Sequence, residues 1–118
     1  MGLFSKITSA MPAVHPHEAH EMLSTGATLL DVREPEEWRA GHAPGSHNVP
    51  LSRLAHWSLA EPEASVVVVC RSGHRSRVAV QALRQAGVDA VNLHGGMSAW
   101  HAAGLPMSSA SGSQPRVL

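Results

Sequence analysis

Short apolar runs alternate along this chain with segments whose apolar residues recur at helical spacing. Three of the runs predict strands, at residues 27–32 (ATLLDV), 65–70 (SVVVVC) and 89–93 (DAVNL). The second run contains four consecutive valines, which is typical of a parallel strand covered on both faces. A further short strand is expected near residues 47–49. Strands that alternate with helices predict an open α/β domain.

Helix signals separate these runs. Residues 15–26 begin with a proline suited to the first helical turn and end at a glycine, and residues 35–41 repeat that pattern. One or two short helices are expected within residues 51–63, and a last helix at residues 97–104. A longer helix, closed by Gly87, follows the valine run. We expect its apolar face to consist of Ala79, Ala82, Leu83 and Ala86.

Length and composition fit a single globular domain. The chain has 118 residues, of which 43% are hydrophobic and 15% charged. We expect an N-terminal arm at residues 1–12, one folded domain at 13–107 and a flexible tail rich in serine and glycine at 108–118. The arm is expected to pack on its own domain or on a second subunit, in a monomer or weak homodimer. No stretch resembles a signal peptide or a membrane span.

The charges balance overall but are unevenly placed. Nine basic and nine acidic residues leave no net charge, which argues against nucleic acid or an anionic membrane as a partner. No Asp or Glu occurs between Glu63 and Asp89. That interval contains four arginines, Arg71, Arg75, Arg77 and Arg84. Any anion that the protein handles is expected to bind there.

The only cysteine, Cys70, ends the valine run and precedes a helix. A lone cysteine excludes an internal disulfide and a dithiol redox site of the thioredoxin kind, and it suits a reducing compartment such as the cytoplasm. The carboxyl end of a strand is where open α/β domains bind ligands. A buried filler is the ordinary role of a free cysteine. Here it is disfavoured, because the hydrophilic RSGHRS segment follows directly.

Two features of that segment predict a reactive thiolate at Cys70. Backbone N–H groups at the start of a helix lack intrahelical partners and can point at an anion, and Gly73 permits a turn that makes them converge. Nearby arginines add full positive charges, so we expect Arg75→Ala to raise the pKa of Cys70. The sequence therefore predicts a thiol with a lowered pKa that is open to solvent.

Three segments resemble the signatures of single-domain rhodaneses, a family of sulfurtransferases. They are CRSGHRS at 70–76, LLDVREPEEWRAGHAPGSHNVPLSRL at 29–54 and LHGGMSAWHAAGLPM at 93–107. The resemblance covers residues 14–107. It implies a rhodanese-like open parallel sheet of about five strands with helices on both faces. It also implies that Cys70 is the catalytic nucleophile, in a cradle made of Arg71, Ser72, Gly73, His74, Arg75 and Ser76.

The activity implied by the resemblance is transfer of sulfane sulfur through a persulfide on Cys70. The donor would be thiosulfate or a low-molecular-weight persulfide, and the acceptor would be cyanide or a thiol, including a thiol of an acceptor protein. No cofactor or metal is expected. The alternative is a non-catalytic sulfur carrier or protein-interaction module. A phosphatase or arsenate reductase of related fold is disfavoured, because such a loop needs arginine where this chain has Ser76.

Other residues are expected to support the structure or to lie near the site. Asp31 and Arg33 are expected to form a structural ion pair near the site, and Trp38 to pack at the edge of the core or wall the site. Glu36 and Glu37 are interpreted as a solvated helix face, although an acidic pair there makes thiosulfate a less certain donor. Histidines at positions 15, 17 and 20 lack the spacing of the zinc-protease motif. His74 is either a ligand-binding or a passive loop residue.

Overall fold

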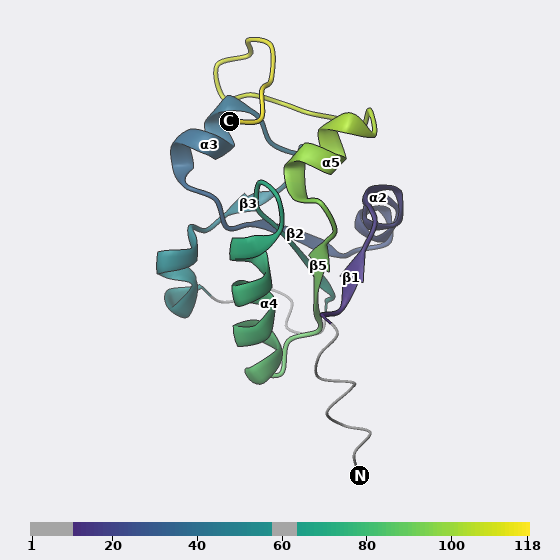
Figure 1. Ribbon diagram of the computed structural model, residues 1–118, viewed down its shortest axis with the longest axis vertical. Helices are drawn as coiled ribbons and strands as arrows, with labels where there is room; N and C mark the ends of the chain where they lie inside the picture. Colours follow the sequence, from purple (N-terminus) through teal and green to yellow (C-terminus); the bar gives the residue numbers. More distant parts are fainter. Residues whose placement is uncertain (1–10, 58–63) are drawn as a thin grey trace.

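A computed structural model describes residues 11–57 and 64–118. Its centre is a five-stranded parallel sheet with the order β1-β5-β4-β2-β3 (Figure 1). The strands are β1 (Ala13–Val14), β2 (Thr28–Asp31), β3 (His47–Asn48), β4 (Val66–Val69) and β5 (Ala90–Leu93). The helices are α2 (Pro16–Ser24), α3 (Pro35–Ala40), the 3-10 helix η1 (Leu51–His56), α4 (His74–Gln85) and α5 (Gly96–Ala102).

The predicted α/β architecture is confirmed, including the five parallel strands. β2, β4 and β5 lie within the three predicted runs, and each predicted helix that falls on described residues is present. β1 is the element that the sequence pattern missed. It has two residues, which pair with Asn92 and Leu93 of β5, and a run of that length carries no periodicity.

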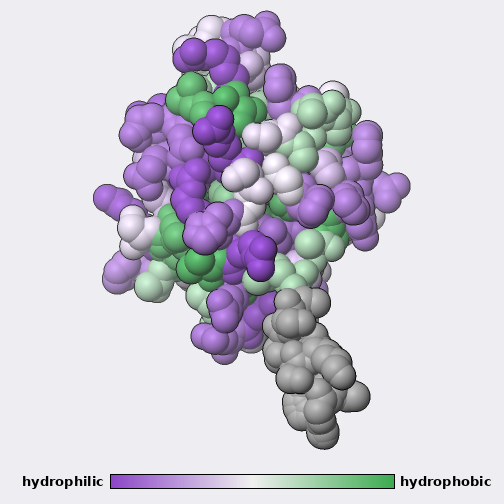
Figure 2. All heavy atoms as spheres, in the orientation of Figure 1, coloured by the Kyte–Doolittle hydropathy of each residue, from purple (hydrophilic) through white to green (hydrophobic). Residues whose placement is uncertain are grey.

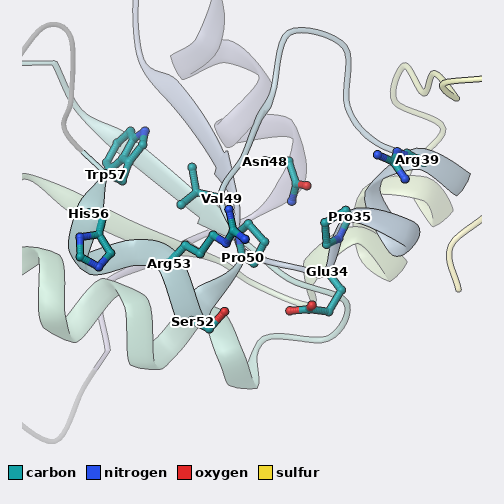
Figure 3. Close-up of a pocket in the computed structure, with 10 residues that line it drawn as sticks. All are labelled: Glu34, Pro35, Arg39, Asn48, Val49, Pro50, Ser52, Arg53, His56 and Trp57. Atoms are coloured by element: carbon teal, nitrogen blue, oxygen red, sulfur yellow. The ribbon is translucent and has the colours of Figure 1, made fainter.

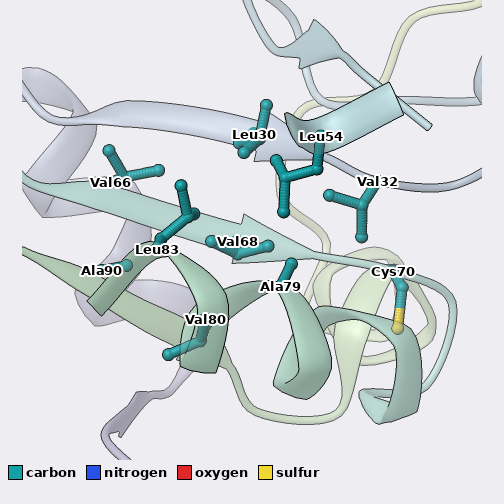
Figure 4. Close-up of a cluster of buried hydrophobic side chains, with 10 residues drawn as sticks. All are labelled: Leu30, Val32, Leu54, Val66, Val68, Cys70, Ala79, Val80, Leu83 and Ala90. Atoms are coloured by element: carbon teal, nitrogen blue, oxygen red, sulfur yellow. The ribbon is translucent and has the colours of Figure 1, made fainter. Parts of the chain in front are cut away.

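Helices cover both faces of the sheet, and each face has its own apolar core. The side chains between the sheet, α4 and η1 are Leu30, Val32, Leu54, Val66, Val68, Cys70, Ala79, Val80, Leu83 and Ala90 (Figure 4). Those on the side of α2 and α5 are Val14, Ala19, Leu29, Ala43, Val67, Val69, Leu93, Met97 and Trp100. Alternate valines of β4 therefore enter different cores, which explains the unbroken valine run.

The apolar face predicted for α4 is partly wrong. Ala82 and Ala86 are exposed, whereas the buried residues of the helix are Ser76, Ala79, Val80 and Leu83. The buried stripe still has helical spacing, but it begins one turn earlier, at a serine. A pattern of apolar letters misses this stripe, because the side chain that starts it is polar and faces Cys70.

The C-terminal segment folds back along α3 (Figure 1). The amides of Ala110 and Arg116 donate to the carbonyl oxygens of Arg39 and Ala40, at 3.0 and 2.8 Å, and Val117 packs against the core on the α2 and α5 side. The flexibility expected for residues 108–118 stays a prediction, but the tail has partners. The expected arm at residues 1–12 lies mostly outside the described residues.

The surface is mainly hydrophilic, with a few apolar areas. Figure 2 shows two of them, one over α3 and the C-terminal segment and one between η1 and α4. The second is a groove whose walls include Leu51, Leu54, Val78 and Leu83. Among the described residues, no helix is long and apolar enough to cross a membrane.

Candidate functional site

The site is built where β4 ends and the chain turns into α4. The backbone at this point is held by α5, because the amides of Met97 and Ser98 donate to the carbonyl oxygens of Cys70 and Arg71, at 2.8 and 3.1 Å. Gly96 makes this approach possible: a Cβ there would overlap both of those carbonyl groups. Gly96, in the 93–107 signature, therefore lets α5 hold the start of the loop that carries the cysteine.

Gly73 turns the loop so that its backbone points at the cysteine. It has φ 120°, a conformation that side-chain-bearing residues rarely adopt, and it is the N-cap of α4. Its amide donates to Cys70 Sγ at 3.1 Å. Figure 4 shows the sulfur pointing at the first turn of α4. The turn predicted at Gly73 is confirmed.

Ser76 is the second direct partner of the sulfur. Its side chain is fully buried in the first turn of α4, and its Oγ lies 3.3 Å from Cys70 Sγ. The same oxygen lies 3.2 Å from the carbonyl oxygen of Gly73 and 2.5 Å from Asn92 Oδ1. Ser76 thus links the cysteine to a polar side chain in the middle of β5.

Asn92 is a site residue that the sequence pattern did not predict. It lies on β5, is 5% exposed, and shares the face of that strand with Ala90, which packs in the α4 core. A signal for it existed: a buried amide in a short strand costs free energy unless it is hydrogen-bonded, so a lone Asn in DAVNL indicates a polar partner. The identity of that partner depends on the fold.

Opposing effects set the charge of Cys70. Burial raises the pKa of the thiol, whereas hydrogen bonds from the Ser76 hydroxyl and from the backbone amides of Ser76, Gly73 and Ser72 lower it. The net pKa lies below the ordinary value of a cysteine. One expectation is wrong: the residue is not open to solvent, because it is 1% exposed. Hydrogen bonds in a closed cradle therefore favour the thiolate over the neutral thiol.

Arg75 does not face the sulfur as a free cation. Its Nη1 and Nη2 donate to the Glu37 carboxylate oxygens at 2.7 and 2.9 Å. The interpretation of Glu37 as a solvated face is therefore wrong, since its side chain is 19% exposed and ion-paired. The hydrogen bond from Arg75 lowers the pKa of Glu37, and Glu37 in turn raises the pKa of Arg75. The negative charge of Cys70 contributes to the raised pKa of Arg75, so the pair lies within electrostatic range of the sulfur.

The predicted supporting residues are Asp31, Arg33 and Trp38. Arg33 Nη2 donates to Asp31 Oδ2 at 2.7 Å and to the Gly41 carbonyl oxygen at 2.8 Å, and both charged side chains are fully buried. The expected structural ion pair is present, and it holds the carboxyl end of α3. Trp38 stacks on His42 with ring centroids 3.6 Å apart and donates from Nε1 to Ser46 Oγ at 3.0 Å. This arrangement is packing at the edge of α3.

The remaining loop residues have their side chains on the surface of the protein. The side chains of Arg71, Ser72 and His74 are exposed. They face the solvent from which a ligand would enter, and they are available to contact it. Within residues 11–57 and 64–118, no group of three or more metal-binding side chains is gathered.

A separate cavity of about 740 Å³ lies beside α3, β3 and η1 (Figure 3). Its lining residues are Glu34, Pro35, Arg39, Asn48, Val49, Pro50, Ser52, Arg53, His56 and Trp57. Cys70 and Ser76 are absent from this lining. We therefore place the candidate chemistry at the loop, where the polarised sulfur lies.

Known proteins resemble this chain in sequence and in fold. A protein of Synechocystis described as uncharacterized is 45% identical over 80 residues, which are 66% of this chain and 45% of that protein. This chain thus spans less than half the length of that relative. The chloroplastic thiosulfate sulfurtransferase 16 of Arabidopsis thaliana is 39% identical over 102 residues, covering 75% of this chain and 85% of that one.

Comparison with solved structures leads to the same family. The crystal structure of a rhodanese-related protein from Thermoplasma volcanium superposes with a TM-score of 0.76 at 34% identity, covering 81% of this chain and 96% of the other. The family described as rhodanese-like domain matches residues 15–103. These residues include the loop, Asn92 and the part of α5 that holds the loop. On this evidence of sequence, fold and loop geometry, the chain belongs to the rhodanese-like domain family.

Proposed function

We propose that this chain is a catalytic sulfurtransferase that carries sulfane sulfur as a persulfide on Cys70. The observation that carries the proposal is the hydrogen bonding of Cys70 Sγ, which accepts from the Gly73 amide at 3.1 Å and lies 3.3 Å from Ser76 Oγ. These contacts lower the pKa of the thiol despite burial. A family member that served only as an interaction surface would have no need of a polarised sulfur.

The chemistry has two displacement steps. With thiosulfate as donor, the Cys70 thiolate attacks the sulfane sulfur, a new S–S bond forms, and sulfite leaves with the electron pair of the broken S–S bond. The acceptor, cyanide or a thiolate, then attacks the outer sulfur, and the Cys70 thiolate leaves. A low-molecular-weight persulfide would donate in the same way, with a thiolate as the leaving group. The chain has no second cysteine, so the sulfur must pass to another molecule.

Arg75 and the chemistry of the thiol bear on the sulfur donor and on the cellular compartment. The Glu37 carboxylate neutralises Arg75, which removes one cation that a dianionic donor would use. This supports a low-molecular-weight persulfide over thiosulfate as the preferred donor. A thiol that must return reduced after each turnover also supports a reducing compartment such as the cytoplasm.

Mass spectrometry of the intact protein tests the persulfide directly. We expect wild-type protein treated with a sulfur donor to gain about 32 Da at Cys70, the mass of one sulfur atom in a covalent intermediate. Cyanide is expected to remove the adduct. Cys70→Ser, which keeps a side chain of similar size, is expected to keep the fold by circular dichroism and to lose both the adduct and turnover.

The outcome of this experiment also separates the alternative. Turnover by Cys70→Ser at a substantial fraction of the wild-type rate would refute the assignment of Cys70. A wild-type protein that accepts sulfur from a protein donor, yet never from thiosulfate or glutathione persulfide, would favour the carrier module instead.

A further inference from the structure

The buried group around Cys70 has more acceptors than hydrogens. Ser76 carries one hydroxyl hydrogen, and three acceptors lie within reach of its oxygen: Cys70 Sγ at 3.3 Å, the Gly73 carbonyl at 3.2 Å and Asn92 Oδ1 at 2.5 Å. Ser76 is fully buried and Asn92 is 5% exposed, so bulk water has little access to make up the difference. The state of the sulfur must therefore decide where the single hydrogen points.

With Cys70 as a neutral thiol, two hydrogens serve the two side-chain contacts of Ser76 Oγ. The S–H donates to Ser76 Oγ, and the Ser76 O–H donates to Asn92 Oδ1. The short Ser76–Asn92 distance fits this chain of donors. It is the arrangement expected while the proton is still on the sulfur.

Ionisation of Cys70 turns the sulfur from a hydrogen-bond donor to Ser76 into an acceptor. The proton leaves to solvent, and the thiolate then needs Ser76 O–H as a donor. The Ser76 oxygen would be left facing Asn92 Oδ1, and two acceptors cannot remain at that distance without a hydrogen between them. A side-chain amide resolves the conflict, since rotation by about 180° about its last torsion exchanges its oxygen and NH₂ ends with almost no change of shape.

We propose that Asn92 is a positioning residue that turns its amide over when Cys70 ionises, so that its NH₂ donates to Ser76 Oγ and the Ser76 hydroxyl donates to the thiolate. The inference rests on the proposed function for its purpose, because sulfur transfer needs the thiolate. Asn92 makes no contact with substrate in this scheme and acts only through Ser76.

The position of Asn92 suits this role. Its backbone pairs with Val68 of β4 and Ala13 of β1, so the strand holds the amide in place on both sides. Its Nδ2 end lies over Gly73, where a Cβ would come within 3.8 Å of it. That distance is an ordinary van der Waals contact, so the amide lies directly beside the turn that directs the Gly73 amide at the sulfur.

NMR of the wild-type protein provides the first test. We expect the Nδ2 proton resonances of Asn92 to change with pH at the same midpoint as the thiolate absorbance of Cys70 near 240 nm. Asn48, the other asparagine, is the internal control, because its Nδ2 donates to the carbonyl oxygens of Asp31 and Arg33 at 3.1 and 2.9 Å and has no reason to turn. Asn92 resonances that ignore the Cys70 midpoint would overturn the proposal, as would the same change in Cys70→Ser.

A double-mutant cycle provides the second test. We expect Asn92→Leu to raise the pKa of Cys70 by up to about one unit, which slows alkylation by iodoacetamide at neutral pH by up to about tenfold. In the Ser76→Ala background, the same substitution is expected to shift the pKa by less than half as much. An equal shift in both backgrounds, or none in either, would show that Asn92 does not act through Ser76.

These measurements use no sulfur donor, so they separate the inference from the function. Resonances that track Cys70 in a protein that forms no persulfide would leave the inference standing and remove the proposed function. A protein that forms the persulfide, with an Asn92 amide that never turns, would leave the proposed function standing and overturn the inference.

Discussion

At the scale of single residues, the sulfur of Cys70 has a charge that matters for stability as well as for chemistry. The hydrogen bonds from Ser76 and the Gly73 amide lower its pKa in the folded protein, although burial opposes them. The unfolded chain has no such contacts, so its thiol titrates near the ordinary value of about 8.5. Between the two pKa values, the unfolded state binds more protons than the native state, and the free energy of unfolding rises with pH.

The corresponding prediction compares wild type with Cys70→Ser. We expect the difference in unfolding free energy between them to grow in favour of wild type as pH rises through the folded pKa, and to level off above about pH 8.5. The gain disappears as pH falls below the folded pKa. Urea denaturation at several pH values measures the difference, and subtraction cancels the other titrating groups. A difference that is constant or shrinks with rising pH would mean that the cradle does not favour the thiolate.

At the scale of elements, α3 and α4 meet through the ion pair between Glu37 and Arg75, whose side chains are 19% and 33% exposed. The two charges act on Cys70 with opposite signs. We expect Glu37→Gln to lower the pKa of Cys70 by freeing the cation, and Arg75→Ala to raise it by leaving the carboxylate unpaired. Both shifts are expected to stay below about one unit, because partly exposed charges are screened by water.

Removing both charges gives the matched control for this pair. The double variant Glu37→Gln with Arg75→Ala is expected to return the Cys70 pKa toward the wild-type value, measured from the pH profile of alkylation. Glu37→Gln is also expected to improve kcat/KM for thiosulfate more than for a persulfide of lower charge, and salt is expected to reduce that gain. A double variant whose pKa is as raised as that of Arg75→Ala alone would show that Glu37 has no influence on the sulfur.

The elements themselves were largely predictable, whereas their contacts were not. The valine run and Gly73 predicted β4 and the turn after it from local sequence, because strand burial and positive φ are properties of neighbouring residues. The partnership of Glu37 with Arg75 joins positions 38 residues apart, and that of Ser76 with Asn92 joins positions 16 apart. Only the fold brings these partners together, so Glu37 looked like part of a solvated helix face and Asn92 had no predicted role.

At the scale of the whole molecule, the C-terminal segment connects the end of the chain to the helix that carries Glu37. The amides of Ala110 and Arg116 donate to the carbonyl oxygens of Arg39 and Ala40, which are among the last residues of α3 and would otherwise lack intrahelical partners. Val117 adds apolar burial against the core. The tail, predicted from composition as flexible, is thus placed to stabilise α3 from outside the folded domain.

Gly41 offers a sharp test of that placement. Its φ of 179° is extended backbone that any residue adopts, so Gly41→Ala brings no conformational strain of its own. A Cβ at this position would nevertheless overlap the backbone of Arg116. We expect Gly41→Ala to lower the free energy of unfolding of the full chain by about 1–2 kcal/mol, by displacing the tail with its hydrogen bonds and apolar contact.

The control is a chain ending at Ser108, in which the Gly41→Ala substitution is expected to be nearly neutral. Chemical denaturation of the four proteins gives the coupling. If Gly41→Ala cost the same with and without the tail, residues 109–118 would not pack on α3 in solution, and the flexibility predicted from their composition would be correct.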